Sequence, residues 1–181
     1  MEVHNDFESI KYSEEEIQNV CKRLGEQITK DYKNKKLLIV GILKGAFIFM
    51  ADLVKNIKTE CVMDFIEASS YYGKDTTSSG VVTITKELGF SVKDYDVILV
   101  EDIIDTGNTL YHIKKMMESE GAKSIKICAL FNKPSRRIKD IEADYMGFTI
   151  ENEFIVGYGL DFDEYYRNIP YVGILKPEIY E

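Results

Sequence analysis

Short continuous apolar runs alternate with amphipathic stretches along this chain, and the two patterns predict different elements. Residues 37–43 and 97–100 are uninterrupted apolar runs, which is the pattern of strands covered on both faces of a sheet. Residues 61–68, 81–85 and 124–131 predict three further strands. Buried central strands of this kind require a covering layer on each side of the sheet.

Helical periodicity marks three stretches between the predicted strands. Ser13 begins a Ser-x-x-Glu capping box, and apolar residues then recur at helical spacing up to Ile28. Residues 46–54 and 110–120 predict two more helices, the second of which ends at Gly121. Repeated strand–helix–strand units predict an α/β fold, with a mainly parallel sheet flanked by helices.

The chain has no obvious seam between domains. It contains no internal repeat, low-complexity tract or proline-rich linker, so we expect a single domain over residues 1–181. Residues 69–80 are rich in hydroxyl groups and glycine and predict a mobile loop. The C-terminal third has shorter apolar patterns and predicts no clear element.

The net charge of −8 restricts the choice of partner. An excess of carboxylates argues against non-specific nucleic-acid binding, which depends on Lys and Arg neutralising phosphates. An anionic small molecule is still compatible, because a few local cations and a metal ion can reverse the potential inside a cleft.

The cysteines and the N-terminal sequence bear on location. The cysteines stand far apart among apolar neighbours without metal-ligand spacing, which predicts buried free thiols in a reducing compartment at Cys21, Cys61 and Cys128. The residues after Met1 lack the pattern of a signal peptide, and no apolar run is long enough to span a bilayer. We therefore expect a cytoplasmic protein without a membrane partner, in which His4 and His112 are structural.

Residues 101–109 carry the chemistry. Glu101 and Asp102 follow a buried run directly, Asp105 comes three residues later, and a Thr-Gly-Asn-Thr turn at residues 106–109 enters a predicted helix. Backbone N–H groups, hydroxyls and a helix N-terminus together suit a phosphate dianion, and carboxylates suit sugar hydroxyls, directly or through magnesium. Ligands of parallel sheets gather at the carboxyl ends of strands, so a sugar phosphate site is predicted here.

Other interpretations of this segment are weaker. Each residue alone also fits a helix N-cap or an ordinary strand end, but the whole run after a buried strand favours a ligand site. The Walker loop and the Gly-x-Gly-x-x-Gly fingerprint are both missing. A magnesium phosphohydrolase would use Asp102 and Asp105, although such enzymes usually separate their two aspartates by two positions rather than three.

Residues 101–109 closely resemble the phosphoribosyl-pyrophosphate signature of the type I phosphoribosyltransferases. Further segments match, in order, motifs of the hypoxanthine-guanine phosphoribosyltransferases: residues 43–47, 69–71, 132–134, 154–161 and 166–167. The resemblance covers nearly the whole chain from the first predicted helix onward. It implies the type I fold, with a flexible lid loop and a small hood built from N-terminal residues and about residues 133–181.

The resemblance also implies a role for each matching residue. The catalytic residues would be Asp105, which faces a ring nitrogen of the base, and Ser70 and Tyr71 on the lid. The ribose and its 5′-phosphate would be bound by Glu101, Asp102, Asp105, Thr106, Gly107, Asn108 and Thr109. Pyrophosphate would be held by Lys44, Gly45 and Arg167, in a loop whose peptide bond is often cis in this family. The purine would be bound by Lys133, Phe154 and Ile155.

Magnesium is the implied cofactor, with Glu101, Asp102 and Asp161 as ligands. The implied substrates are phosphoribosyl pyrophosphate and hypoxanthine or guanine, and the products are IMP or GMP and pyrophosphate. The implied assembly is a homodimer or homotetramer.

The sequence departs from the family in two places. Many relatives carry Ile-Pro-Asp-Glu before the aromatic residue, whereas residues 150–153 here read Ile-Glu-Asn-Glu, and Tyr72 adds a second aromatic residue to the lid. Fine base preference therefore stays open, and transfer to another base such as xanthine is an alternative. A nucleotide-binding regulatory protein without catalysis is another, but it predicts damage to Asp105 or the pyrophosphate loop, and both are intact.

Overall fold

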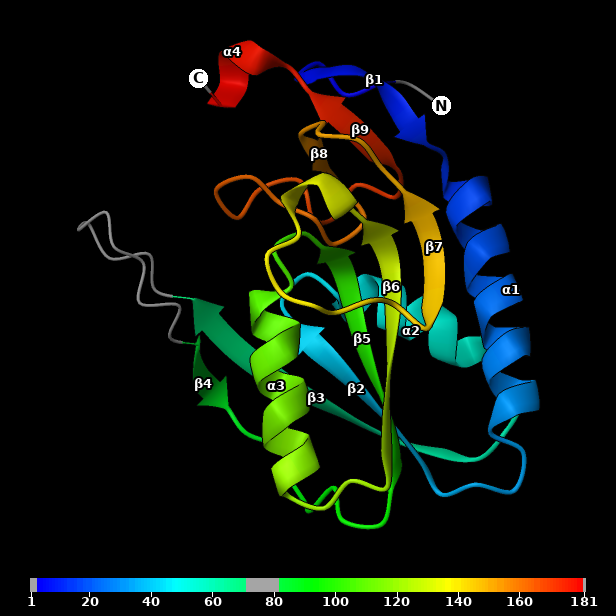
Figure 1. Ribbon diagram of the computed structural model, residues 1–181. Helices are drawn as coiled ribbons and strands as arrows, with labels where there is room; N and C mark the ends of the chain where they lie inside the picture. Colours follow the sequence, from blue (N-terminus) through cyan, green and yellow to red (C-terminus); the bar gives the residue numbers. More distant parts are fainter. Residues whose placement is uncertain (1–2, 71–81, 181) are drawn as a thin grey trace.

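The computed structural model describes residues 3–70 and 82–180 of the chain. A six-stranded sheet lies at its centre, in the order β4-β3-β2-β5-β6-β7 (Figure 1). Its strands are β2 (Leu37–Leu43), β3 (Cys61–Ser70), β4 (Val82–Lys86), β5 (Asp96–Ile104), β6 (Ser124–Asn132) and β7 (Tyr145–Thr149). All neighbours pair in parallel except β4, which joins β3 antiparallel at the edge. The predicted α/β fold is confirmed.

Helices cover both faces of this sheet (Figure 1). They are α1 (Glu14–Asp31) and α2 (Phe47–Lys55) on one face and α3 (Asn108–Ser119) on the other. Along β5, Ile98 and Val100 pack in the core on the α1 and α2 side, whereas Val97 and Leu99 pack on the α3 side. Because successive strand residues point to opposite faces and both faces are buried, the run has to be apolar at every position.

The start of α1 follows its local sequence. Ser13 accepts a hydrogen bond from the Glu16 N–H, and the Glu16 carboxylate accepts one from the Ser13 N–H. This reciprocal pair satisfies N–H groups that a helix start leaves unpaired. The predicted helix and its capping box are confirmed.

A smaller antiparallel sheet lies beyond the carboxyl ends of β5 and β6 (Figure 1). Its strands, in spatial order, are β1 (Phe7–Tyr12), β9 (Val172–Leu175) and β8 (Ile155–Val156). The short α4 (Pro177–Tyr180) follows β9, and the one-turn 3-10 helix η1 (Pro134–Arg136) follows β6. β1, near the N-terminus, pairs with β9, near the C-terminus, and no local pattern in the sequence predicted this pairing.

Two predicted boundaries were wrong. β5 continues to Ile104 in register with β6, so Glu101 and Asp102 lie inside the strand rather than after it. β3 continues through Ser69 and Ser70, which pair with β4, so the predicted loop begins later. In both cases hydrogen bonding to a neighbouring strand extends a segment whose local composition suggests an end. Tyr71 and the other predicted lid residues up to position 80 lie outside the described residues.

Two of the three cysteines are buried as predicted. Cys21 and Cys128 are buried free thiols, whereas Cys61 is only half-buried. Burial raises the pKa of Cys21 to about 11, so this thiol stays protonated at neutral pH.

None of the helices in residues 3–70 and 82–180 combines the length and the apolar character that crossing a bilayer requires.

Candidate active site

The turn between β5 and α3 presents backbone N–H groups at a helix start. Gly107 is the N-cap residue and has a φ of 75°, a left-handed conformation that favours glycine. A Cβ at this position would overlap the Ile141 side chain. The Asn108 N–H donates to Thr106 Oγ1 at 3.3 Å, which closes the turn. The turn has the form of an anion site, because its N–H groups add to the positive end of the α3 dipole.

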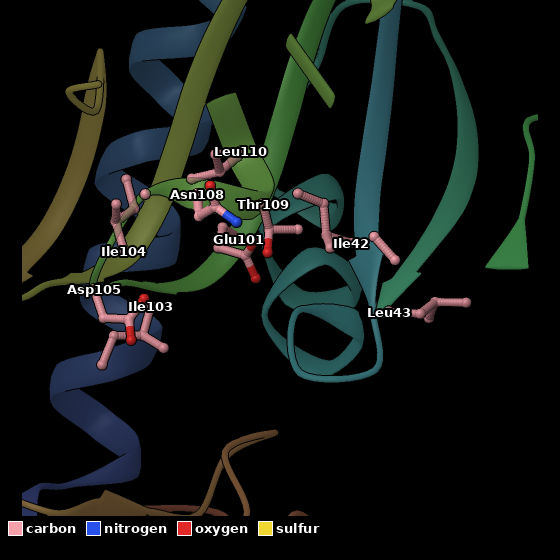
Figure 2. A pocket seen from close by; sticks show the side chains of 11 residues that line it. Ile42, Leu43, Glu101, Ile103, Ile104, Asp105, Asn108, Thr109 and Leu110 are labelled. Atoms are coloured by element: carbon pink, nitrogen blue, oxygen red, sulfur yellow. The ribbon is translucent and has the colours of Figure 1, made fainter. Parts of the chain in front are cut away.

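A cavity opens beside this turn. Its lining includes Glu101, Asp105 and residues 107–110, together with the end of β2. Figure 2 shows the Glu101 and Thr109 side chains at this cavity, close to Ile42. We call it the phosphate-side cavity. Apart from the end of β2 and Ala68, it is built from one short stretch of the chain.

A second cavity lies on the other side of the β5 end and is built from remote segments. It is lined by Asp102, Ile103, Asp105, Lys133, Arg136, Glu153, Phe154, Ile155, Leu160 and Asp161. We call it the base-side cavity. Glu101 lines the first cavity and Asp102 the second, because successive strand residues point to opposite sides. Asp105 lines both cavities.

Glu101 and Asp102 form a strained electrostatic pair. Burial raises the pKa of Glu101 well above its usual value, and the neighbouring Asp102 charge adds to this rise. Burial also raises the pKa of Asp102, although hydrogen bonds from Glu101 and from the Ile103 N–H, at 2.7 Å, oppose the increase. A bound cation would relieve this unfavourable concentration of negative charge.

The loop that carries the predicted pyrophosphate residues Lys44 and Gly45 lies against Asp102. The peptide bond between Leu43 and Lys44 is cis, as the resemblance to the phosphoribosyltransferases implied for this loop. Gly45 lies directly against Asp102, so that a Cβ at Gly45 would overlap the Asp102 carboxylate. Arg167 donates to the Gly159 carbonyl at 2.8 Å, and Gly159 in turn packs against the Gly45 carbonyl. Tertiary packing thus brings three separate segments into contact.

Two cations in this region share one exposed carboxylate. Lys44 Nζ lies 3.1 Å and Arg167 Nη2 3.4 Å from Glu164 Oε2. Arg167 also pairs with Asp161 at 2.8 Å, and its buried Nε has no hydrogen-bond partner among the described residues. Two positive groups that meet at a surface glutamate could exchange it for another anion.

Lys133 is a buried cation in the base-side cavity. Only 7% of the residue is exposed, and Nζ donates to the Glu153 carbonyl at 2.9 Å. Burial lowers the pKa of Lys133, and the Arg136 charge lowers it further. A donor in this position would discriminate strongly between ligands, because leaving it unpaired is costly.

The segment before Phe154, which departs from the family pattern, is held from two sides. Lys11 of β1 forms an ion pair with Glu153 at 2.8 Å, and Lys133 binds the Glu153 carbonyl. Phe154 itself is 37% exposed, and Ile155 is buried in β8. The ion pair therefore holds the segment before Phe154 in place at the cavity, which its departure from the family sequence did not predict.

Arg137 is a residue that sequence reasoning missed. Its guanidinium donates to the carbonyls of Ile104, Asp105 and Ile141 and to Asn132 Oδ1. It therefore holds the end of β5, the end of β6 and the start of the phosphate turn together. No periodicity or spacing could identify it, since the four converging acceptors come from three places in the chain.

Glu101, Asp102 and Asp161 suit a magnesium ion that takes its other ligands from water and substrate. Among the described residues, no group of three or more His, Cys, Asp or Glu side chains is placed to hold a metal ion. Magnesium commonly keeps several waters and binds through one or two carboxylates plus substrate phosphates. Asp102 and Asp161 share the base-side cavity and Glu101 lies next to Asp102, so the donor set suits an ion that arrives with a phosphate. The predicted ligand roles stay predictions.

Comparison with known proteins agrees with these features. A family model described as "Phosphoribosyl transferase domain" matches residues 12–163. The chain is 52% identical over 178 residues to the hypoxanthine-guanine phosphoribosyltransferase of Staphylococcus aureus (strain Mu50 / ATCC 700699), which covers 98% of this chain and 99% of that protein.

Solved structures are similar over nearly the whole chain. A hypoxanthine phosphoribosyltransferase from Staphylococcus aureus has a TM-score of 0.95 at 52% identity, covering 98% of this chain and 96% of that one. A hypoxanthine-guanine phosphoribosyltransferase from Bacillus anthracis has a TM-score of 0.87 at 40% identity, covering 94% and 99%.

Proposed function

The chain belongs to the phosphoribosyl transferase domain family, among its hypoxanthine-guanine members, and we propose that it transfers the phosphoribosyl group of phosphoribosyl pyrophosphate to hypoxanthine and guanine. The products would be IMP or GMP and pyrophosphate. One observation carries the proposal: Asp105 lines both the phosphate-side and the base-side cavity. A sugar phosphate in the first and a purine in the second would meet at this side chain.

The phosphate-side cavity would hold the ribose phosphate. The N–H groups and hydroxyls of Thr106, Gly107, Asn108 and Thr109 would bind the 5′-phosphate, and Glu101 and Asp102 the ribose hydroxyls. Fixing the sugar in this way places its anomeric carbon for attack and removes much of the entropic cost of the encounter.

The reaction would be a displacement at the anomeric carbon. A purine ring nitrogen forms the new bond to this carbon, and the bond to pyrophosphate breaks with its electron pair on the leaving group. Asp105 would accept the ring N–H proton of the purine as the base becomes part of the nucleotide. One Asp105 oxygen already accepts the Thr106 N–H, so the carboxylate is oriented before the substrate arrives.

Leaving pyrophosphate would be received at the loop of Lys44 and Gly45. Lys44 and Arg167 would exchange Glu164 for the pyrophosphate oxygens, which carry more charge. Glu101, Asp102 and Asp161 would hold a magnesium ion, whose contribution is to neutralise the charge that develops on the leaving group. Ser70, which is the last residue of β3, and Tyr71, which lies outside the described residues, would act at a lid that excludes water.

Base selectivity would depend on Lys133. A 6-oxopurine offers its exocyclic oxygen to Lys133 Nζ, which donates to the Glu153 carbonyl in this structure. Adenine offers an amino group there, which leaves the N–H of Lys133 that faces the base without an acceptor and costs about 1–3 kcal/mol. Phe154 would stack on the purine, and the Ile155 backbone would meet its edge.

The test is pyrophosphate release from phosphoribosyl pyrophosphate, measured with hypoxanthine, guanine, xanthine and adenine, with and without Mg²⁺. We expect release with the first two bases and only with Mg²⁺ present. Release with xanthine alone would support the rival specificity, and no release with any base would contradict the proposal.

We also propose a cytoplasmic homodimer or homotetramer. Light scattering of the purified protein would test the assembly, and fractionation of cells would test the location.

A further inference from the structure

Phe154 is itself stacked on a second aromatic ring. The ring centroids of Phe154 and Tyr180 lie 4.7 Å apart, with their planes 14° from parallel. Phe162 meets Phe154 edge-on, at 5.7 Å and 84°. Tyr180 thus covers one face of Phe154 and Phe162 packs perpendicular to it, while Phe154 still lines the base-side cavity.

The segment that carries Tyr180 is fastened to the backbone of Phe154. The Leu175 N–H donates to the Phe154 carbonyl at 2.9 Å. Lys176 then binds the N-terminal segment, with its N–H on the Asp6 carbonyl at 3.0 Å and its Nζ on the Asn5 carbonyl at 2.7 Å. The position of α4 relative to Phe154 is therefore fixed by hydrogen bonds of Leu175 and Lys176, the two residues before α4.

Apolar packing fixes the orientation of α4 as well. Ile179 packs against the core of the smaller sheet, which is formed by Phe7, Val156, Tyr171 and Leu175. With Ile179 directed into this core, the next residue, Tyr180, is carried onto the Phe154 ring. The stack consequently depends on the fold of the smaller sheet and not on a chance surface contact.

We propose that Tyr180 is a positioning residue for the purine, acting through Phe154. The inference rests on the proposed function, in which Phe154 stacks on the base. A ring already held by two neighbouring rings loses less freedom when a base binds its other face, and offset aromatic stacks add stabilisation beyond buried area. The bound base, Phe154 and Tyr180 would form a stack of three rings, whose last member comes from the C-terminal helix.

Steady-state kinetics of three Tyr180 variants test this role. Tyr180→Ala removes the ring, Tyr180→Leu keeps apolar bulk without an aromatic face, and Tyr180→Phe keeps the ring without the hydroxyl. We expect Ala and Leu to raise KM for hypoxanthine about three- to tenfold, and Phe to stay within about twofold of wild type. KM for phosphoribosyl pyrophosphate and kcat should stay within about twofold in all three.

The matched control is Phe90→Ala. Phe90 is 40% exposed, against 37% for Tyr180, and among the described residues it also contacts a single ring, that of Tyr95 at 6.0 Å. It lies in the loop before β5 and lines neither cavity. Thermal unfolding of Phe90→Ala and Tyr180→Ala shows whether the two truncations cost similar stability, and only the second should change KM for hypoxanthine.

A double-mutant cycle with Phe154→Leu tests whether Tyr180 acts through Phe154. We expect Tyr180→Ala to have no further effect on KM for hypoxanthine once Phe154 is Leu, because the stack is already lost. Additive effects would overturn the inference, as would a wild-type KM in Tyr180→Leu. If the unaltered protein itself transfers no phosphoribosyl group to hypoxanthine, the proposed function fails. If the unaltered protein does transfer the group and Tyr180→Ala has the same KM for hypoxanthine, only the inference about Tyr180 fails.

Discussion

The two cavities on either side of the β5 end are built in opposite ways. The phosphate-side cavity takes most of its lining from residues 101–110, which follow one another along a strand, a turn and the start of a helix. The base-side cavity takes Lys133 from directly after β6, Phe154 from directly before β8 and Asp161 from a later loop. In the proposed function, the groups that would bind the ribose phosphate are therefore close together in the sequence, whereas the groups that would select the base come from remote segments.

This difference has a physical basis. A phosphate dianion needs several N–H groups at one point, and a glycine turn at a helix start supplies them within four residues. A purine needs a flat apolar face together with hydrogen-bond partners at its edges, so its pocket requires side chains from several directions. The base side should therefore vary through distant substitutions, whereas the phosphate side should tolerate few changes.

Asp105→Asn, at the junction of the two cavities, should have the largest effect. The amide cannot accept the proton of the purine, so kcat should fall by about a hundredfold or more, in line with the usual contribution of a general base. Binding of phosphoribosyl pyrophosphate, measured by calorimetry, should be kept because the turn amides remain. An unchanged kcat would remove Asp105 from the mechanism and leave the two cavities unconnected.

Lys133→Ala should damage the base side alone. We expect kcat/KM for hypoxanthine to fall about ten- to a hundredfold, because a buried charged hydrogen bond to the base is lost. KM for phosphoribosyl pyrophosphate should change far less. Lys126→Ala is the control, since Lys126 lies on β6, the strand that leads to Lys133, and its ion pair with Asp144 is exposed. Equal losses for both substrates would contradict the separation of roles.

Arg137→Lys should damage the phosphate side alone. Lysine keeps the charge but cannot reproduce the fork of donors that holds Ile104, Asp105 and Asn132. We expect KM for phosphoribosyl pyrophosphate to rise about tenfold and the free energy of unfolding to drop by about 2 kcal/mol. Arg23→Lys, at an exposed arginine that donates to the Met146 carbonyl at 2.9 Å, should do neither. A selective loss in KM for hypoxanthine would show that Arg137 serves the base side instead.

Glu101→Gln should have the smallest effect, and in an unusual direction. The pKa of Glu101 is raised above its ordinary value of 4.5 in the folded protein. The folded state therefore holds this proton more tightly than the unfolded chain, and the stability that it contributes is present below pH 4.5 and lost as pH rises toward the raised pKa. Glutamine carries no charge, so Glu101→Gln removes this loss of stability at higher pH.

Urea unfolding without substrate would measure the effect. We expect Glu101→Gln to raise the free energy of unfolding by about 1 kcal/mol at pH 7 and to leave it unchanged near pH 4. Glu118→Gln is the control, because the exposed ion pair with Lys115 lowers the pKa of Glu118. Removing that charge should therefore lower, not raise, the free energy of unfolding at pH 7. If Glu101→Gln is less stable than wild type at pH 7, the Glu101 carboxylate is stabilised by other groups in the substrate-free protein, and the prediction is wrong.

The sequence alone determined the parts of this protein that depend on neighbours along the chain. The apolar run at residues 37–43 predicted the bounds of β2, and the capping box at Ser13 predicted the start of α1. The turn at residues 106–109 could be interpreted because its amides, hydroxyls and helix start are consecutive. Such features are readable since strand burial, capping and turn conformation act over a few residues.

Only the tertiary structure decided the parts that depend on distant partners. β1 forms because β9 lies beside it, and Glu101 belongs to β5 because β6 continues alongside. The four acceptors of Arg137 and the stack of Tyr180 on Phe154 join segments that are far apart in the chain. Packing and hydrogen bonding across such separations leave no periodic trace in the sequence, which is why the supports of the site appeared only when the chain was folded.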